Sequence, residues 1–286
     1  MLSIGGTGRA VALTVTAMLA FAGNSLLTRM ALRDGAIDAA SFTSIRLASG
    51  AVALLLLFRL LRSGATSRGH GGWWSAFALF AYAIAFSLAY LSLSAGAGAL
   101  ILFGFVQATM IVSGLRGGER RSAAQWSGWL IAFAGMVWLL APGVEAPSPG
   151  GAALMALAGI AWGVYSIRGR HESDAFAATT TNFLLSLAFV AGLTLLTIGT
   201  AEVGMRGVLL AVVSGAVTSG AGYVVWYAAL EHLATLQAAL VQLSVPAIAA
   251  LGGVVFLAEP LTMRLVLASL AVLGGIALSL GAGRRD

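Results

Sequence analysis

The sequence predicts an all-α polytopic membrane protein with ten transmembrane helices, arranged as two inverted five-helix repeats. Of the 286 residues, 59% are apolar and only 9% are charged, whereas about 25% of the residues of a soluble domain are charged. Long apolar blocks follow one another with short connections, and landmarks of the first half recur in the second half. The composition excludes an ordinary soluble enzyme, a disordered chain and a nucleic-acid-binding protein.

Ten apolar blocks are long enough to cross a bilayer, because a helix needs about 20 mostly apolar residues to span a hydrocarbon core about 30 Å thick. In chain order the blocks are Arg9–Arg29, Ala40–Leu61, Trp73–Leu93, Gly96–Leu115, Ala123–Ala141, Gly150–Ile167, Ala175–Ile198, Arg206–Leu230, Ala234–Leu257 and Thr262–Leu280. Blocks of this length disfavour a transmembrane β-barrel, whose strands appear as short segments of alternating hydrophobicity.

The arginines predict the orientation of the helices. All 16 basic residues are arginine, and they lie singly or in pairs, mostly between the blocks. Ten crossings put both termini on one side, which carries eleven arginines against four on the other. Because positive charge accumulates in cytoplasmic connections, we expect both termini to be cytoplasmic and the protein to lie in the cell inner membrane. Charges in this pattern orient helices and do not predict a nucleic-acid partner.

An internal repeat divides the chain at its middle, into residues 1–143 and 144–286. An offset of 140 residues aligns Gly23 with Gly163, Glu119 with Glu259 and Gly135 with Gly275. Each half carries five blocks, so the second half must cross the membrane in the opposite direction to the first. Inverted repeats of this kind are typical of secondary transporters, whose substrate site lies near the bilayer midplane between the halves. We expect the two halves to form one integrated membrane domain.

Several short motifs resemble those of the drug/metabolite transporter superfamily, EamA type, in their order, spacing and duplication. They are Phe21–Ser25 at the end of the first block, Arg46 early in the second, Gly118–Arg121 after the fourth, Leu257–Pro260 after the ninth, and Pro246 within the ninth. The first half has Val106 at the position equivalent to Pro246 and departs from the pattern there. The resemblance covers nearly the whole chain.

The resemblance implies ten helices in an inverted repeat that export or exchange small metabolites by alternating access through a central cavity. Within the superfamily we favour amino-acid and metabolite exporters, including those of the YddG type. Efflux of aromatic or lipophilic drugs and exchange of nucleotide sugars or organophosphates remain alternatives. The partners would be small solutes and the lipid bilayer. A monomer would be sufficient, because a duplicated chain can enclose its own pathway.

Four neutral polar side chains are expected near the middle of the blocks and are candidates for lining the cavity. They are Asn24, Tyr82, Gln107 and Gln242. Such groups can both donate and accept hydrogen bonds, which suits a zwitterionic or hydroxylated solute. The alternative is a hydrogen bond between neighbouring helices, which contributes about 0.6 kcal/mol on average.

Two groups of aromatic residues form the other part of the predicted cavity wall. Trp162 and Tyr165 share one helical face, and Tyr223 and Trp226 share another, because residues three apart are neighbours on a helix. Tyr227 extends the second group. The alternative is a belt at the membrane–water interface. Trp162 lies deeper than the others and is our preferred cavity residue.

Arg46 and Pro246 are expected to have special roles. Arg46 is the only charge well inside a block. It can attract a substrate carboxylate, or it can reach the external headgroups or bridge neighbouring helices. Its position near the start of the block favours the second interpretation. Pro246 removes one backbone hydrogen bond in mid-helix and should bend the ninth helix, which predicts a gating role.

No block carries an acidic residue at its centre. Antiporters that exchange cations for protons commonly use such a carboxylate, so downhill export or exchange of neutral or zwitterionic solutes fits better. The chain contains no cysteine, no protease or hydrolase motif and no phosphate-binding loop, and its three histidines, His70, His171 and His232, lie in connections. We therefore expect no catalytic residue, no metal site and no cofactor.

Overall fold

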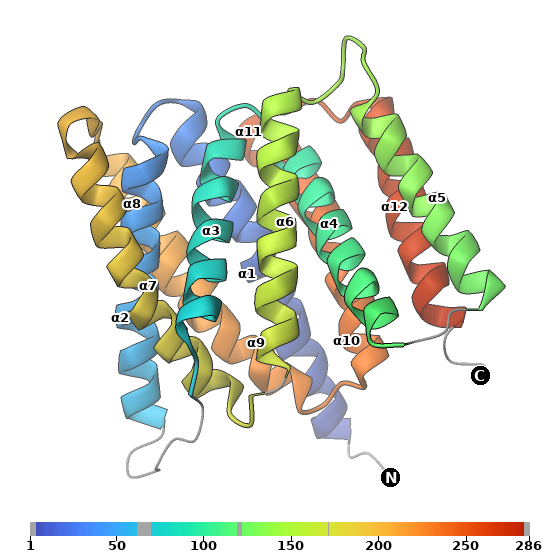
Figure 1. Ribbon diagram of the computed structural model, residues 1–286, viewed down its shortest axis with the longest axis horizontal. Coiled ribbons are helices and arrows are strands. Elements are labelled where there is room, and N and C mark those ends of the chain that lie inside the picture. Colours follow the sequence, from blue (N-terminus) through green and yellow to red (C-terminus); the bar gives the residue numbers. More distant parts are fainter. Residues whose placement is uncertain (1–3, 62–69, 119–121, 171, 283–286) are drawn as a thin grey trace.

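The computed structural model describes residues 4–61, 70–118, 122–170 and 172–282, and these residues form a bundle of helices (Figure 1). Ten helical segments among them are long and apolar enough to cross a membrane, which confirms the predicted number. The first five spans are α1 (Ile4–Arg33), α2 (Ala39–Leu61), α3 (Trp73–Tyr90), α4 (Ala95–Arg116) and α5 (Ala123–Leu140).

The other five spans include two that are interrupted, which the sequence analysis had predicted as single continuous helices. They are α6 (Pro149–Gly169), α7 (Ala175–Thr197) with the 3₁₀ turn η1 (Ile198–Thr200), α8 (Met205–Val213) continued by the π-helix η2 (Ser214–Ala221) and α9 (Gly222–Leu230), α10 (Thr235–Gln242) continued by α11 (Ser244–Leu257), and α12 (Met263–Ala282). The π-helix and the break after α10 are therefore corrections to the prediction.

Several helices begin at a polar side chain that satisfies a free backbone N–H group. Ser94, Ser122, Ser148 and Asp174 each accept a hydrogen bond from the backbone nitrogen three residues later. This is the usual arrangement at a helix start, where the first four N–H groups have no partner within the helix. These residues fix where α4, α5, α6 and α7 begin.

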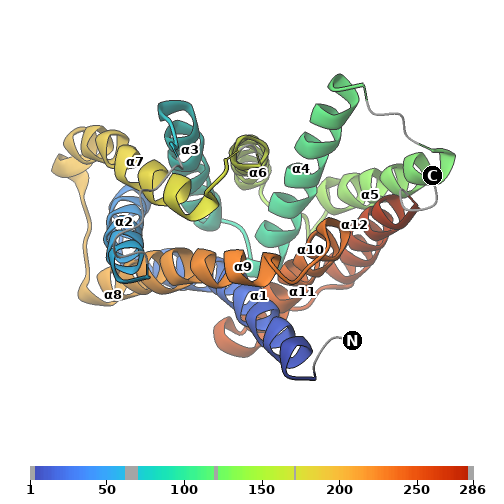
Figure 2. The ribbon, with the colours of Figure 1, turned by 90° about the horizontal axis from the view of Figure 1, so that it is seen from below.

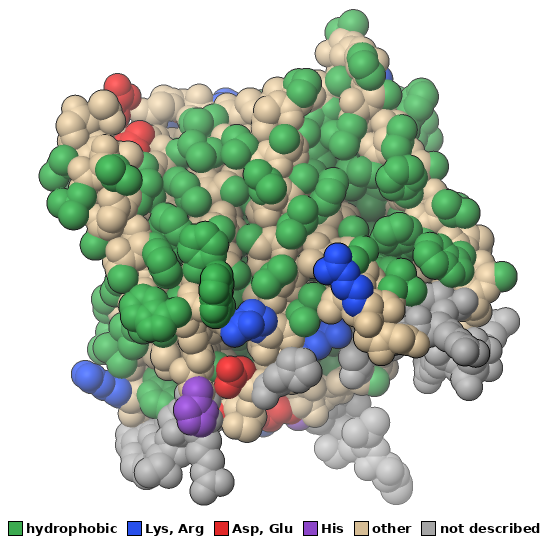
Figure 3. Space-filling model, viewed as in Figure 1, with side chains coloured by type: hydrophobic (Ala, Val, Ile, Leu, Met, Phe, Trp, Pro, Cys, Tyr) green, Lys and Arg blue, Asp and Glu red, His purple; other side chains and the backbone are tan. Residues whose placement is uncertain are grey.

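The outer surface matches a lipid environment. Hydrophobic side chains cover the middle of the face seen in Figure 3, while arginine, acidic and histidine side chains gather mainly toward its lower edge. Trp73, Trp74 and Trp126 are exposed near helix ends, as expected for residues at the membrane–water interface.

Three helix–helix contacts join spans that are equivalent to each other under the predicted repeat. If each span of the first half corresponds to the span five places later, then α2 with α7, α4 with α11 and α5 with α12 are pairs of equivalent spans, and each of these pairs is in contact. The α5 and α12 helices form a two-helix unit at one end of the molecule (Figure 2). The inverted repeat itself stays a prediction, with which this pairing is consistent.

Glycines let α5 and α12 approach backbone to backbone. A Cβ atom added to Gly275 would lie 2.6 Å from the backbone nitrogen of Ala132, and one added to Gly135 would lie 3.1 Å from that of Val272. Residues 132 and 272 are separated by the same 140 positions as the two glycines, so the contacts are equivalent. A side chain at either glycine would push the helices apart, which agrees with a packing role for small residues.

The step from Gly159 to Gly163 on α6 has the same function against α4. Added Cβ atoms would lie 2.7 Å from the carbonyl oxygen of Leu102 and 2.7 Å from Cβ of Thr109. These glycines thus bring α6, which carries Trp162, close to α4.

We predict that Gly275→Ala destabilises the protein by about 1–3 kcal/mol, the usual cost of overpacking a tight contact. The neighbouring Gly274→Ala is the matched control, because a Cβ there would meet nothing within 4 Å. Thermal unfolding in detergent should show a lower melting temperature only for the first variant. Equal melting temperatures would contradict the proposed close contact.

Candidate substrate-binding site

Aromatic rings from five helices meet in what we call the aromatic cluster. It consists of Phe21, Tyr82, Phe86, Trp162, Tyr165, Phe183, Tyr223, Trp226 and Tyr227. Trp162 is central, with ring centroids 4.9 Å from Tyr82, 5.1 Å from Tyr165 and 5.6 Å from Tyr223. The last two rings are nearly parallel to the indole, a favourable stacked arrangement.

Both halves of the chain contribute to this cluster. Tyr82 comes from α3 of the first half, and Trp162, Tyr165 and Tyr223 come from α6 and α9 of the second half. The structure therefore brings these four candidates together. Trp226 joins them through the ring of Phe21, whose centroid lies 5.8 Å from those of both Trp226 and Tyr223.

The cluster contains residues that sequence reasoning missed. Phe21, Phe86 and Phe183 were not candidates, because no local pattern shows which face of an apolar helix points inward. Tyr227 was weighed as a belt residue, but its ring lies 6.4 Å from that of Tyr223 and nearly parallel to it. Its hydroxyl also hydrogen-bonds that of Thr179 on α7.

Arg46 is buried beside the aromatic cluster and does not reach the headgroup region. Only 2% of the residue is exposed. Nη2 donates a hydrogen bond of 3.1 Å to the hydroxyl of Tyr82, and the guanidinium carbon lies 5.4 Å and 5.1 Å from the ring centroids of Tyr82 and Phe86. Nη1 is buried and has no hydrogen-bond partner. Arg46 thus bridges α2 and α3 with part of its charged group left unpaired.

Asn24 joins α1 to the π-helix η2. Its Oδ1 accepts hydrogen bonds from Ser214 at 2.9 Å, Thr218 at 2.6 Å and Ser219 at 3.3 Å. The π-helix, a rare geometry often found at functional sites, turns these three hydroxyls toward one acceptor. Gly215 lies in the same segment and packs directly on the backbone carbonyl of Arg46. Asn24 is therefore engaged between helices, one step away from the arginine.

The remaining candidates lie on α4 and at the break in the ninth span. Gln107 is buried on α4 and Gln242 is half-buried at the end of α10. Among the described residues no hydrogen bond joins either glutamine to the aromatic cluster. Pro246 has no N–H group and cannot donate the helical hydrogen bond to the carbonyl of Gln242. The helix is interrupted between these two residues at Leu243, which agrees with the predicted bend.

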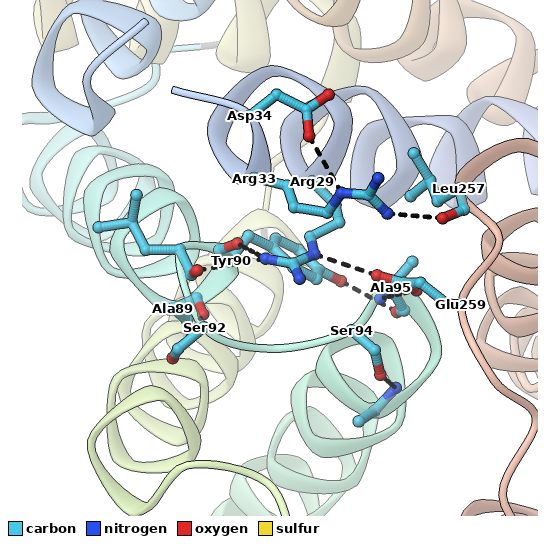
Figure 4. A network of polar contacts seen from close by, with 12 residues as sticks. Arg29, Arg33, Asp34, Ala89, Tyr90, Ser92, Ser94, Ala95, Leu257 and Glu259 are labelled. Carbon is cyan, nitrogen blue, oxygen red and sulfur yellow. Dashed lines mark hydrogen bonds and ion pairs between the residues drawn. The ribbon is translucent and has the colours of Figure 1, made fainter. Parts of the chain in front are cut away.

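A polar network lies at the end of the molecule opposite to the termini (Figures 1 and 4). Arg29 Nε pairs with Glu259 Oε1 at 3.0 Å, and Glu259 Oε2 accepts from the backbone nitrogen of Ala95 at 2.8 Å. Arg29 Nη1 also donates to the carbonyl oxygens of Tyr90 and Leu91. We call this the Arg29–Glu259 network. It ties α1 to the start of α4 and the end of α11, across the two halves.

At the same end, hydrogen bonds also join the α1–α2 connection to the α7–α8 connection. The backbone nitrogen of Asp38 donates to the carbonyl of Glu202, whose nitrogen donates back to Asp38 Oδ2 at 3.0 Å. Burial alone would raise the pKa of the Asp38 carboxyl, but hydrogen bonds from Ser41, Glu202 and Ala40 outweigh it and hold that pKa below its usual value. The carboxylate therefore stays ionised and holds the α1–α2 connection against the α7–α8 connection.

The described residues contain no group of three or more His, Cys, Asp or Glu side chains that could hold a metal ion. Glu119, the repeat equivalent of Glu259, and His171 lie outside the described residues. The chemistry of the site thus comes from one arginine, aromatic rings and hydroxyl groups. Such a site can bind an organic solute but offers no acid–base pair near it.

We predict that Glu259→Gln opens the end of the molecule at which the Arg29–Glu259 network lies. Thr28 is fully buried on the same helix as Arg29, and the chain has no cysteine, so Thr28→Cys supplies a single reporter thiol. Loss of a charged hydrogen-bond partner costs about 1.5–3 kcal/mol, so a membrane-impermeant thiol reagent should label the double variant about tenfold faster.

Asp34→Asn in the same Thr28→Cys background is the matched control. It also removes a carboxylate paired with arginine, but that carboxylate is 42% exposed and contacts neither Arg29 nor Glu259. Its labelling rate should equal that of Thr28→Cys alone. If Glu259→Gln behaved like this control, the network would not close the structure.

Comparisons with known proteins agree with this architecture. The model of the EamA-like transporter family matches residues 149–281. An uncharacterised protein of Pseudomonas aeruginosa is 54% identical over 272 residues, which are 95% of this chain and 94% of that protein. A crystal structure that is 22% identical matches the fold with a TM-score of 0.68 and covers 98% of this chain and 99% of its own. The chain therefore belongs to the EamA-like transporter family of the drug/metabolite transporter superfamily.

Proposed function

We propose that this multi-pass membrane transporter exports amino acids and related small metabolites across the cytoplasmic membrane. The main support is the buried, partly unpaired Arg46 beside an aromatic cluster that both halves build. A charge inside a membrane domain is costly and is usually functional. Carriers bind their substrate between two halves that can move relative to each other, and the contribution of rings from both halves to the aromatic cluster supports this proposal.

The proposed mechanism is alternating access between the halves 1–143 and 144–286. The mechanism depends on an inverted repeat. The contacts of α2 with α7, α4 with α11 and α5 with α12 support this repeat, because each contact joins two equivalent spans. All rings of the aromatic cluster come from one chain, so a monomer is sufficient. The excess of arginine at the end that carries the termini supports cytoplasmic termini in the inner membrane.

The charge distribution separates this proposal from its alternatives. Nucleotide sugars and organophosphates are commonly held by several basic groups, whereas Arg46 is the one basic residue that contacts the rings of the cluster in the described part of the chain. Lipophilic drugs suit the aromatic rings, but a cationic drug would be repelled by Arg46. Amino acids offer both a carboxylate and, in many cases, an apolar side chain. No acidic residue lies within a span, which favours downhill export or exchange.

The proposal predicts counterflow in proteoliposomes. Vesicles loaded with one unlabelled amino acid should transiently accumulate the labelled one above its external concentration, for several members of a panel that includes Thr, Met, Phe and Trp. Vesicles without protein are the control. A flat response from folded, inserted protein across the whole panel would contradict amino-acid transport. A response without saturation would indicate a channel.

Pro246→Ala should reduce the rate of counterflow several-fold while leaving thermal stability nearly unchanged. Alanine restores the N–H group that the carbonyl of Gln242 lacks, so the ninth span should lose the bend on which gating depends. Pro147→Ala, in the α5–α6 connection, is the matched control. Unchanged transport by folded Pro246→Ala protein would remove the gating role.

A further inference from the structure

We propose that Arg46 and Tyr82 together bind the carboxylate of an organic acid with an aromatic or large apolar body, and that an α-amino group is not required. This inference rests on the proposed transport function and narrows its substrate class. The site would therefore accept simple aromatic carboxylic acids as well as aromatic amino acids, and would reject the corresponding amines.

The first argument is the charge of Arg46. An arginine in a protein does not deprotonate, so burial cannot neutralise it. No described carboxylate lies within ion-pair distance of its guanidinium, and the aromatic rings of Tyr82 and Phe86 compensate the charge only in part. A buried charge without a counter-ion is strongly unfavourable. An anionic group of the solute would supply the missing partner.

The second argument is the arrangement of hydrogen-bond donors. Nη1 of Arg46 is fully buried and donates to nothing, although Nη2 on the same guanidinium carbon is bonded to the Tyr82 hydroxyl. That hydroxyl accepts from the arginine, and no described acceptor takes its own hydrogen. Two neighbouring donors therefore lack acceptors. A carboxylate has two oxygens and can accept from both, with the short, strong bonds typical of charged partners.

The third argument concerns the rest of the solute. Tyr82 is in ring contact with Trp162, which stacks with Tyr165 and Tyr223. Trp162 is only partly buried, so this central ring has surface left to cover. A solute held by Arg46 would lay an apolar or aromatic body against Trp162 and Tyr223, where ring pairs add to the gain from burial.

The fourth argument is the lack of a partner for an ammonium group. Every acidic residue of the described chain lies in a connection between spans, and none lies within one helical turn of Trp162, Tyr165 or Tyr223 along the chain. An ammonium ion at the aromatic cluster would lose its hydration and gain only contacts with ring faces and hydroxyls. A zwitterion therefore has no advantage over the acid that lacks the amino group.

Three ligands with the same phenyl body test this inference directly. Isothermal titration of purified protein in detergent would compare 3-phenylpropionate, phenylalanine and phenethylamine, which differ in carrying the carboxylate, both groups or the amine alone. We expect 3-phenylpropionate to bind at least as tightly as phenylalanine and phenethylamine to bind at least tenfold more weakly. Equal binding of the amine, or loss of binding when the amino group is removed, would overturn the inference.

Matched variants assign the effect to the two donors. Arg46→Gln should weaken 3-phenylpropionate binding about 10- to 100-fold, the range expected for a lost charged hydrogen bond. Tyr82→Phe should weaken it less and tests the site even if Arg46→Gln does not fold. Arg206→Gln removes an arginine that is 62% exposed and should bind as the unmodified protein does. Unchanged affinity in both Arg46→Gln and Tyr82→Phe would overturn the assignment.

The outcomes also separate this inference from the proposed function. If 3-phenylpropionate binds through Arg46 but no solute shows counterflow, the binding site stands and the carrier mechanism fails. If amino acids show counterflow but the carboxylate series does not depend on Arg46, the carrier stands and this inference fails.

Discussion

The lipid environment imposes one constraint on which the whole structure depends: backbone polar groups inside the membrane must be satisfied within the protein. Ten helices meet this requirement along most of their length. The two exceptions are both in the second half. In η2 the geometry changes to a π-helix, whose hydroxyls converge on Asn24, and in the ninth span Pro246 interrupts the backbone ladder. Both of these deviations therefore lie where spans of the two halves meet.

Close packing and a buried charge are linked through these deviations. Gly215 of η2 rests on the backbone carbonyl of Arg46, so the π-helix packs directly against the backbone that carries the arginine. Arg46 in turn holds Tyr82, which touches Trp162. A continuous chain of contacts thus runs from Asn24 on α1 through the π-helix and Arg46 to the aromatic cluster. Binding of an anion at Arg46 would act on all of these elements.

The sequence predicted what depends on local pattern and missed what depends on which helix faces inward. Apolar length predicted the ten spans. Pro246 marked the break in the ninth span. The π-helix was missed because its three hydroxyls find their common acceptor in Asn24, which lies far away in the chain. The position of Arg46 in its block left open whether the side chain reaches the headgroups or bridges neighbouring helices, and in the structure it is buried and bridges to Tyr82 on α3. Phe86 and Phe183 gave no signal among many other apolar residues.

The equivalent contacts of Gly135 and Gly275 between α5 and α12 have a bearing on ancestry. A surface that meets its own equivalent across a two-fold axis is isologous, as in a symmetric dimer. Two separate five-helix proteins could associate through such a surface only if copies were inserted in both orientations, a dual topology. Joining the units in one chain removes that requirement. The arginines of a single chain can then accumulate on one side and fix one orientation.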